Sequence, residues 1–434
     1  MSYVLLVLLL FEIFLIYKCN GENVVSPSFI SCAMFILSIF VFVLGKNYFK
    51  YSLNLLTIVT IFVFLFCILL GEYTSNYINT RYIKEETMFE YIYVQKSVCV
   101  LLALIVFALG IIYFIEVYRF SLKVGNFSGN WATMAMYVRE SKMYSKSTLV
   151  SQGTLLSECI FYFCIYCFFN NLNYGKKEMR FFIPIIAFFP HIMAADNRTT
   201  LLKILSISCI MIFALMKKKS HWEKQNNGKI VIFAALVIVV FLCAFRLLGY
   251  RTETSIRNSL WNNLMEYISA SLVGLDQYLL QIKMKNILVG QWTLAGIYNI
   301  LRQWGLNIPI VDKFEPFFSY GDIYKSNIYT AFKAYIQDYT YLGGMVAMYL
   351  WGYFITNKLN SVKRGHDDFY HLCVLGLFFY PVAMISIEDV TSSVICMQTV
   401  YMLIYLKIIE YFLIKRGVTI GRGMETINEK GRLL

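Results

Sequence analysis

The chain has 434 residues, of which 59% are apolar and only 15% are charged. Soluble globular proteins have about a quarter of their residues charged, so this composition excludes a soluble domain, a disordered chain and a coiled coil. Lys and Arg number 39 against 26 Asp and Glu, and in a protein with many spans such an excess collects in cytoplasmic loops and does not indicate nucleic-acid binding. Nearly all the cysteines lie in apolar segments, so no set of extramembrane disulfide partners is expected.

Apolar blocks of helical length recur along the chain. Because they are continuously apolar and do not alternate, they predict spanning helices and not a transmembrane barrel. The sequence therefore predicts an all-α, polytopic integral membrane bundle with about eleven (ten to twelve) transmembrane helices and one large extracytoplasmic helical loop. The blocks cover residues 2–17, 27–44, 53–71, 97–115, 149–169, 181–195, 201–216, 230–249, 339–356, 372–387 and 394–413.

Basic residues indicate the orientation most clearly in the second half. Lysines crowd the loop 217–229, and further basic residues lie at 358–364 and from 415 onward. The positive-inside rule places these segments in the cytoplasm and the stretch 250–338 outside. In the first half the rule leaves two alternatives open, an external amino terminus with eleven spans or an internal one with an extra passage near 124–138.

This reading divides the chain into four parts. We expect an N-terminal transmembrane bundle of about eight spans over 1–249, a large outer loop over 250–338, about three C-terminal spans over 339–413 and a cytoplasmic tail over 414–434. Apolar residues within the loop recur at helical spacing, and connections of this length are usually functional. We therefore look for the site there.

Three arginines are predicted near the outer face. Arg198 lies in the turn after the sixth block, and Arg251 and Arg257 follow the block 230–249. Arginine binds phosphate oxygens in a bidentate manner and keeps its charge, so the pattern favours an anion site. The alternative is that each arginine only anchors a helix end at the interface.

Further polar residues lie where the outer loop returns to the membrane. Asp338 stands at the entrance of an apolar helix, where it could accept a proton or simply cap the helix. His191, near the outer end of its block, is a second candidate base, and the alternative is a buried helix histidine. Glu388 and Asp389 could line the same cavity or form a solvated turn. The sequence contains no nucleotide-binding or metal-binding motif, so no cofactor and no metal is expected.

The segment 326–332 carries a resemblance to a known family. It reads Ser-Asn-Ile-Tyr-Thr-Ala-Phe, with Asp338, Tyr339 and Gly343 close behind, and it includes Asn327, Tyr329 and Thr330. This pattern, with Arg198 and the Arg251 region upstream, resembles the oligosaccharide repeat unit polymerases, or O-antigen polymerases of the Wzy type. In that family a glycine is expected where this chain has Thr340. The resemblance covers the architecture of nearly the whole chain, and specific residues only between about 190 and 350.

The resemblance implies a glycosyltransferase that polymerises undecaprenyl-diphosphate-linked oligosaccharide repeat units into O-antigen, capsular or related surface polysaccharide. It would act at the outer face of the bacterial cytoplasmic (inner) membrane. Its partners would be the lipid-linked donor and acceptor, the bilayer and a polysaccharide chain-length regulator, with no nucleic acid.

The chemistry of such a transfer fits the residue types. A sugar diphosphate is already a good leaving group, so the enzyme needs cations over the developing charge and a group that positions or deprotonates the acceptor hydroxyl. The candidate cations are Arg198, Arg251 and Arg257, the candidate bases are Asp338 and His191, and the further candidate substrate contacts are Asn327, Tyr329 and Thr330.

Two alternative functions stay open. An O-antigen ligase resembles this architecture and transfers glycan to the lipid A core, although the Asn-Ile-Tyr-Thr segment favours the polymerase. A lipid-linked oligosaccharide flippase or other transporter also needs many helices and basic residues. Transporters usually show internal repeats, and none is evident in this sequence.

Overall fold

The computed structural model describes most of the chain. The described residues are 1–20, 22–79, 89–127, 129–131, 134–141, 143–195, 198–222, 228–232, 260–281, 286–310, 315–321 and 324–420. The chain forms two compact units, each built from segments that are distant in sequence. The first unit comprises Met1–Lys84, Thr254–Arg364 and Leu377–Thr399, and the second comprises Glu85–Glu253, Gly365–Gly376 and Val400–Leu434. The four sequential parts expected above, which are defined by membrane topology, stay a prediction.

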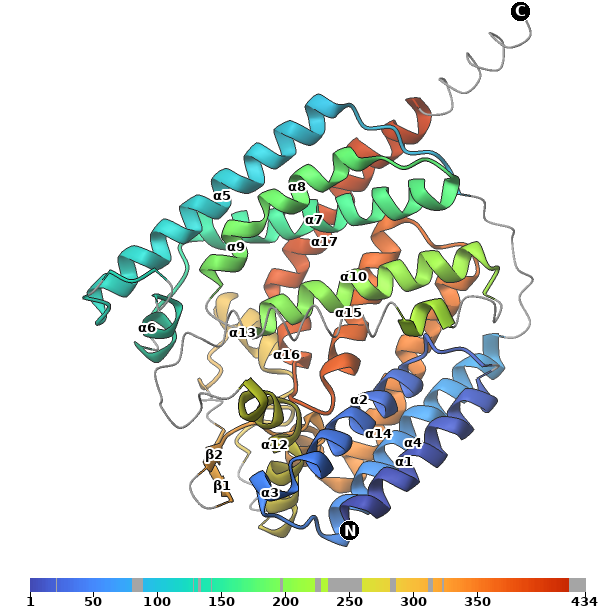
Figure 1. The fold of residues 1–434 in the computed structure, drawn as a ribbon, viewed down its shortest axis with the longest axis vertical. Coiled ribbons are helices and arrows are strands. Elements are labelled where there is room, and N and C mark those ends of the chain that lie inside the picture. The colour runs from blue at the N-terminus through green and yellow to red at the C-terminus, as the bar shows by residue number, and fades with distance from the viewer. Residues whose placement is uncertain are drawn as a thin grey trace, which may run out of the picture. The chain divides into compact units, whose positions relative to one another are not determined.

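The first unit is organised around two long helices, α4 (Leu55–Asn79) and α14 (Ala331–Lys363), which pack along each other (Figure 1). Its other described elements are α1 (Ser2–Cys19), α2 (Pro27–Leu44), α3 (Lys46–Phe49), α12 (Leu260–Leu280), α13 (Ala295–Gln303), α16 (Thr391–Val394), and the strands β1 (Phe318–Tyr320) and β2 (Tyr324–Ser326). The strands form an antiparallel hairpin in which Phe318 pairs with Ser326. The sequence predicted only helices in this stretch.

The second unit is organised around α5 (Lys96–Lys123), which packs against α6 (Met134–Ser141) and against three further helices of the unit. These are α7 (Thr148–Tyr174), α8 (Phe182–Ala187) and α9 (Phe189–Ala194), while α10 (Arg198–Lys219) packs against α7. The unit also contains the 3-10 turn η1 (Met179–Phe181) and the π-helical segment η3 (Glu410–Lys415). Helices α15 (Phe369–Met384) and α17 (Met397–Ile409) each have residues in both units.

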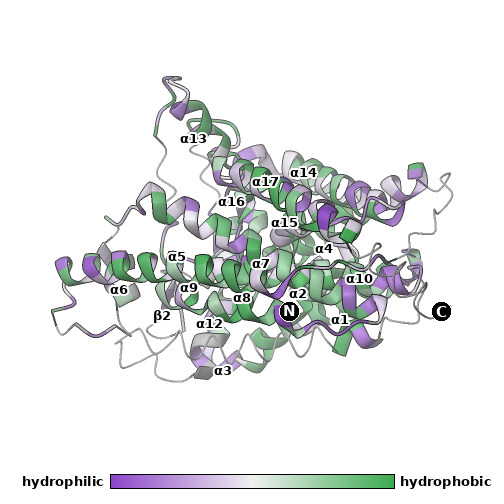
Figure 2. Cartoon of the chain, turned by 90° about the horizontal axis from the view of Figure 1, so that it is seen from above, coloured by the Kyte–Doolittle hydropathy of each residue, from purple (hydrophilic) through white to green (hydrophobic). Residues whose placement is uncertain are grey.

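Seven of the described helices are long and apolar enough to cross a membrane, judged by length and composition. They are Ser2–Cys19, Pro27–Leu44, Leu55–Asn79, Lys96–Lys123, Thr148–Tyr174, Thr199–Lys219 and Met397–Ile420, and shorter apolar helical stretches cover Met179–Ala194 and Phe369–Met384. Figure 2 shows apolar residues along much of the length of helices such as α5. The prediction of a helical fold with several helices that could span a membrane is confirmed. The count of about eleven spans stays a prediction, and most of the block 230–249 lies outside the described residues.

Two glycines allow the backbones of α4 and α14 to meet. A β-carbon added at Gly71 would lie 2.0 Å from the carbonyl oxygen of Tyr349, and one added at Gly352 would lie 2.2 Å from the carbonyl oxygen of Ile68. Both distances are far below van der Waals contact, so any larger residue would force the helices apart. Small residues on facing helices are a common device for close packing in membranes.

Helix α14 is interrupted at Thr340, whose backbone has φ 65° and ψ 177°. This conformation breaks the ladder in which each N–H bonds to the carbonyl four residues earlier. Near the break, the Asn286 amide donates to the carbonyl oxygen of Gln337 at 2.7 Å, and it also donates to Asp338 Oδ1 at 3.1 Å. A loop side chain thus satisfies backbone and carboxylate oxygens beside the kink.

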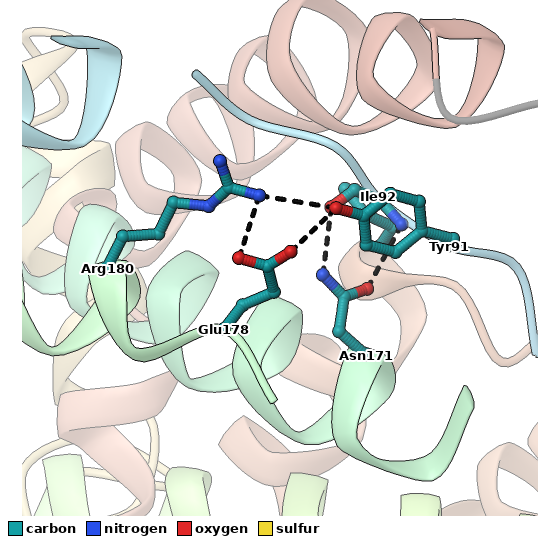
Figure 3. Close-up of polar contacts among 5 residues, drawn as sticks. All are labelled: Tyr91, Ile92, Asn171, Glu178 and Arg180. Atoms are coloured by element: carbon teal, nitrogen blue, oxygen red, sulfur yellow. Dashed lines mark hydrogen bonds and ion pairs between the residues drawn. The ribbon is translucent and has the colours of Figure 1, made fainter. Parts of the chain in front are cut away.

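In the second unit, polar side chains hold the segment before α5 against the end of α7 (Figure 3). The Asn171 side chain accepts from the N–H of Ile92 at 3.0 Å and donates to its carbonyl at 2.9 Å, much as a neighbouring strand would. The Tyr91 hydroxyl donates to Glu178 at 2.6 Å, and Arg180 pairs with the other oxygen of Glu178 at 2.8 Å. These bonds anchor an extended segment that has no regular secondary structure of its own.

Candidate functional site

The first unit contains an apolar groove along α14 between Tyr335 and Phe354, with a volume of about 810 Å³. Its lining comes from α14, α15, the residues directly before α13, and the segment around α16. The lining residues are Thr293, Leu294, Tyr335, Tyr339, Gly343, Val346, Ala347, Leu350, Trp351, Tyr353, Phe354, Phe378, Thr391 and Ile395. The hydroxyl groups of Thr293, Tyr335, Tyr339 and Thr391 gather near the break in α14, so this part of the groove is polar.

Asp338 organises one side of this polar end. Its carboxylate accepts the backbone N–H of Trp292 at 3.1 Å, the backbone N–H of Thr293 at 2.8 Å and the hydroxyl of Thr293 at 2.8 Å, in addition to the Asn286 amide. The residue is only 7% exposed. A carboxylate with this many donors holds the 286–293 loop against α14. Its part in catalysis stays a prediction.

Tyr335 organises the other side. Its hydroxyl lies 2.8 Å from the Thr391 hydroxyl and accepts a hydrogen bond from the indole N–H of Trp351. The rings of Tyr335 and Tyr339 have centroids 6.3 Å apart, so the two sets of hydroxyl groups are close neighbours. These bonds fix the orientation of Tyr335, and the 2.8 Å hydrogen bond between the hydroxyls of Tyr339 and Thr293 fixes that of Tyr339.

A buried lysine lies beside the groove. Lys333 forms an ion pair with Glu315, and its ammonium lies 4.0 Å from the ring centroid of Trp292 and 4.9 Å from that of Tyr329. Burial lowers the pKa of Lys333, although Glu315 and Asp338 act in the opposite direction. With its charge matched by a carboxylate and aromatic faces, Lys333 fixes the loops to α14.

The structure gives the three residues of the Asn-Ile-Tyr-Thr segment different environments. Asn327 is exposed, Tyr329 is buried and donates to the carbonyl of Pro316 at 2.8 Å, and Thr330 is buried immediately before α14. The Thr330 hydroxyl has no hydrogen-bond partner among the described residues. Of the three, only Asn327 is presented openly for a contact with substrate.

His191 belongs to the second unit and is only 3% exposed. Its Nε2 lies 3.2 Å from the carbonyl of Val106, so Nε2 must carry the proton, and Nδ1 has no partner among the described residues. The cavity beside it, lined by Lys146, Thr154 and Thr200 among others, has a volume of only about 20 Å³. That is room for about one water molecule, which matches the alternative of a buried helix histidine.

The described residues do not test the predicted arginine site. Arg198 is the first residue of α10, and its side chain is outside the part of the chain that the structure describes, as are Arg251 and Arg257 entirely. The phosphate-binding role of all three stays a prediction.

The acidic pair of the 388–393 turn is partly buried. Asp389 accepts the N–H of Thr391 at 3.0 Å, and Glu388 has a buried Oε1 with no partner among the described residues. Burial, reinforced by the neighbouring Asp389, raises the pKa of Glu388 to about 7.

Sequence reasoning missed Tyr335, Trp351, Thr391 and Lys333. The sequence did carry a signal for Tyr335, because it lies four residues before Tyr339 and so shares a helix face with it. Thr391 gave none, since only the fold brings it to Tyr335.

No protein-family model matches this chain, and no curated protein or solved structure is significantly similar to it. Within the described residues, no group of three or more His, Cys, Asp or Glu side chains is placed to hold a metal ion.

Proposed function

We propose that this chain is a glycosyltransferase of the bacterial cytoplasmic membrane that polymerises undecaprenyl-diphosphate-linked oligosaccharide repeat units into a surface polysaccharide at the outer face. The observation that carries the proposal is the apolar groove along α14 with hydroxyl groups at one end. A long polyprenyl chain needs an apolar surface, and its saccharide needs hydrogen-bonding groups at the end of that surface.

Two further features support the proposal. Two tyrosines of the polar end, Tyr335 and Tyr339, lie within ten residues after the Asn327–Thr330 segment on which the family resemblance rests. Thr340, in the position where the family has a glycine, adopts a backbone with positive φ that glycine favours. In the proposed reaction the groove positions the acceptor or donor lipid, and the three arginines stabilise the departing diphosphate.

The proposal can be tested by filling the groove. Val346 and Leu350 line it, whereas Leu342 lies on the same helix, is 72% exposed and does not line it. We expect Val346→Trp and Leu350→Trp to reduce a glycan length ladder to a single repeat unit, and Leu342→Trp at matched abundance to leave the ladder intact.

The deletion phenotype separates the alternatives. Loss of a polymerase leaves one repeat unit on the surface, and loss of a flippase leaves none. Loss of a ligase leaves a polymer that is not joined to the lipid A core. A normal ladder in the deletion strain would exclude the polymerase.

A further inference from the structure

The hydrogen bonds around Tyr335 leave one hydroxyl proton without an acceptor among the groups that form them. Three protons are available, from the indole N–H of Trp351 and from the hydroxyls of Tyr335 and Thr391. The Trp351 proton is given to Tyr335, and the bond between the two hydroxyls uses one more. Whichever hydroxyl donates in that bond, the other keeps a proton, and both residues line the groove.

The hydrogen bonds around Asp338 leave an acceptor free, where those around Tyr335 leave a proton free. The Thr293 hydroxyl donates to Asp338 Oδ2 at 2.8 Å and lies 2.8 Å from the Tyr339 hydroxyl. Because the Thr293 proton is committed to the carboxylate, Tyr339 must donate to Thr293. The phenol oxygen of Tyr339 then has a lone pair available as an acceptor in the groove.

Charge also restricts what can bind at this end. Asp338 and Asp389 are both close enough to act electrostatically on Tyr339, and Lys333 is paired with Glu315. A phosphate offers only acceptor oxygens, so it cannot donate to the free lone pair of Tyr339. Its negative charge is also repelled by the nearby carboxylates of Asp338 and Asp389. A sugar hydroxyl donates and accepts at once, and Tyr and Trp rings offer faces on which a sugar can pack.

We propose that the polar end of this groove binds a hydroxyl group of the saccharide of a lipid-linked glycan, which accepts from the Tyr335–Thr391 pair and donates to Tyr339. The diphosphate, which joins the saccharide to the lipid, makes no contact with these hydroxyl groups. This inference rests on the proposed function, since it names the part of the substrate that the groove selects.

The test measures binding to the full-length protein in lipid nanodiscs. The probes are an alkyl β-glucoside and an alkyl phosphate that carry the same brominated chain, and the readout is saturable quenching of tryptophan fluorescence, because Trp351 lines the groove. We expect the glucoside to bind at least about tenfold more tightly than the phosphate, the difference that about one hydrogen bond provides. Equal binding, or tighter binding of the phosphate, would overturn the proposal without use of any variant.

Variants then test the free proton of the Tyr335–Thr391 pair and the free acceptor of Tyr339 separately. Tyr339→Phe and the double change Tyr335→Phe/Thr391→Val should each weaken glucoside binding about tenfold and leave phosphate binding unchanged. Thr391→Val alone should weaken glucoside binding less than the double change, because the Tyr335 hydroxyl can then donate its proton to the sugar. Tyr349→Phe is the matched control, since Tyr349 lies on the same helix and does not line the groove. Wild-type glucoside affinity in both of the first two variants would contradict the proposal.

The failure of this inference is distinguishable from failure of the proposed function. A glucoside preference combined with a normal glycan ladder in the deletion strain would retain the sugar site and exclude the polymerase. A single-repeat phenotype in the deletion strain, combined with no preference for the glucoside, would retain the polymerase and exclude the sugar site.

Discussion

At Thr340 the backbone adopts φ 65° and ψ 177°, a region that is populated almost only by glycine and costs other residues about 1–3 kcal/mol. Thr340→Gly should remove this strain at a smaller cost in the entropy of the unfolded chain. We expect the apparent melting temperature in detergent to rise by a few degrees, on the order of 1 kcal/mol of stability. Thr340→Val, which keeps the strain, should melt at or below the wild-type temperature; a rise equal to that of the glycine variant would contradict this account.

Glu388 should make the stability of the protein depend on pH. The pKa of its carboxyl is raised from 4.5 to about 7 by burial and by Asp389, so the folded protein holds a proton that the unfolded chain releases. Stability should therefore fall as pH rises from 4.5 to 7 and level off above that, with a total effect of at most about 3 kcal/mol. Glu388→Gln should remove this part of the pH dependence of stability. The stability of the variant relative to wild type should therefore be higher at pH 8 than at pH 4.5. Melting curves at both pH values check this, and equal slopes in the two proteins would refute it.

The three arginines can be tested by a change that keeps their charge. Arg198→Lys, Arg251→Lys and Arg257→Lys each retain a long stem and a positive head, so an arginine that merely anchors a helix end should tolerate the change. A bidentate diphosphate contact should not. We expect at least two of the variants to insert normally and yet lose about a hundredfold in polymerisation rate, the effect of about 3 kcal/mol in the transition state. Normal ladders from all three would exclude the arginine site.

At the scale of elements, the crossing of α4 and α14 requires glycine at two positions, Gly71 and Gly352. Gly71→Ala and Gly352→Ala would each place a β-carbon about 2 Å from a carbonyl oxygen of the partner helix, and such overpacking typically costs about 1–3 kcal/mol. Both variants should show lower folded yield and lower melting temperature by fluorescence-detected size exclusion. Gly228→Ala, where a β-carbon meets nothing within 4 Å, is the control. Wild-type behaviour of both crossing variants would mean that the helices do not meet in this way.

Long apolar runs predicted the main helices well, because run length and continuous apolarity alone select a spanning helix. The break in α14 was not predictable in the same way. Threonine is not a helix breaker, and the amide that bonds beside the break, Asn286, is 51 residues from Gln337 in sequence. The hairpin Phe318–Ser326 was missed for a similar reason, since strands this short carry little periodic signal.

At the scale of the whole molecule, the sequence located part of the candidate site. Asp338 and Tyr339 were recognised through a local motif, and local motifs can be read from sequence. Thr293 and Thr391 reach the same groove from other segments, and only tertiary packing brings them together. The chemistry of the groove therefore became visible only with the fold.

The orientation of the chain in the membrane is itself a prediction. The lysines of 217–229 should keep this loop in the cytoplasm, and the stretch 250–338 should lie outside. Alkaline phosphatase fused after Lys219 should be inactive, and the same reporter fused after Gly305 should be active. The opposite pattern would move every proposed site residue to the wrong side.

The glycine crossing also has a consequence for ancestry. Most positions of a membrane helix can drift, because one apolar side chain replaces another at little cost. Gly71 and Gly352 cannot, since any β-carbon meets main-chain atoms of the opposite helix, and no compensating side-chain change can move those atoms. Distant descendants of a common ancestor should therefore keep this pair of glycines after most of the surrounding sequence has diverged.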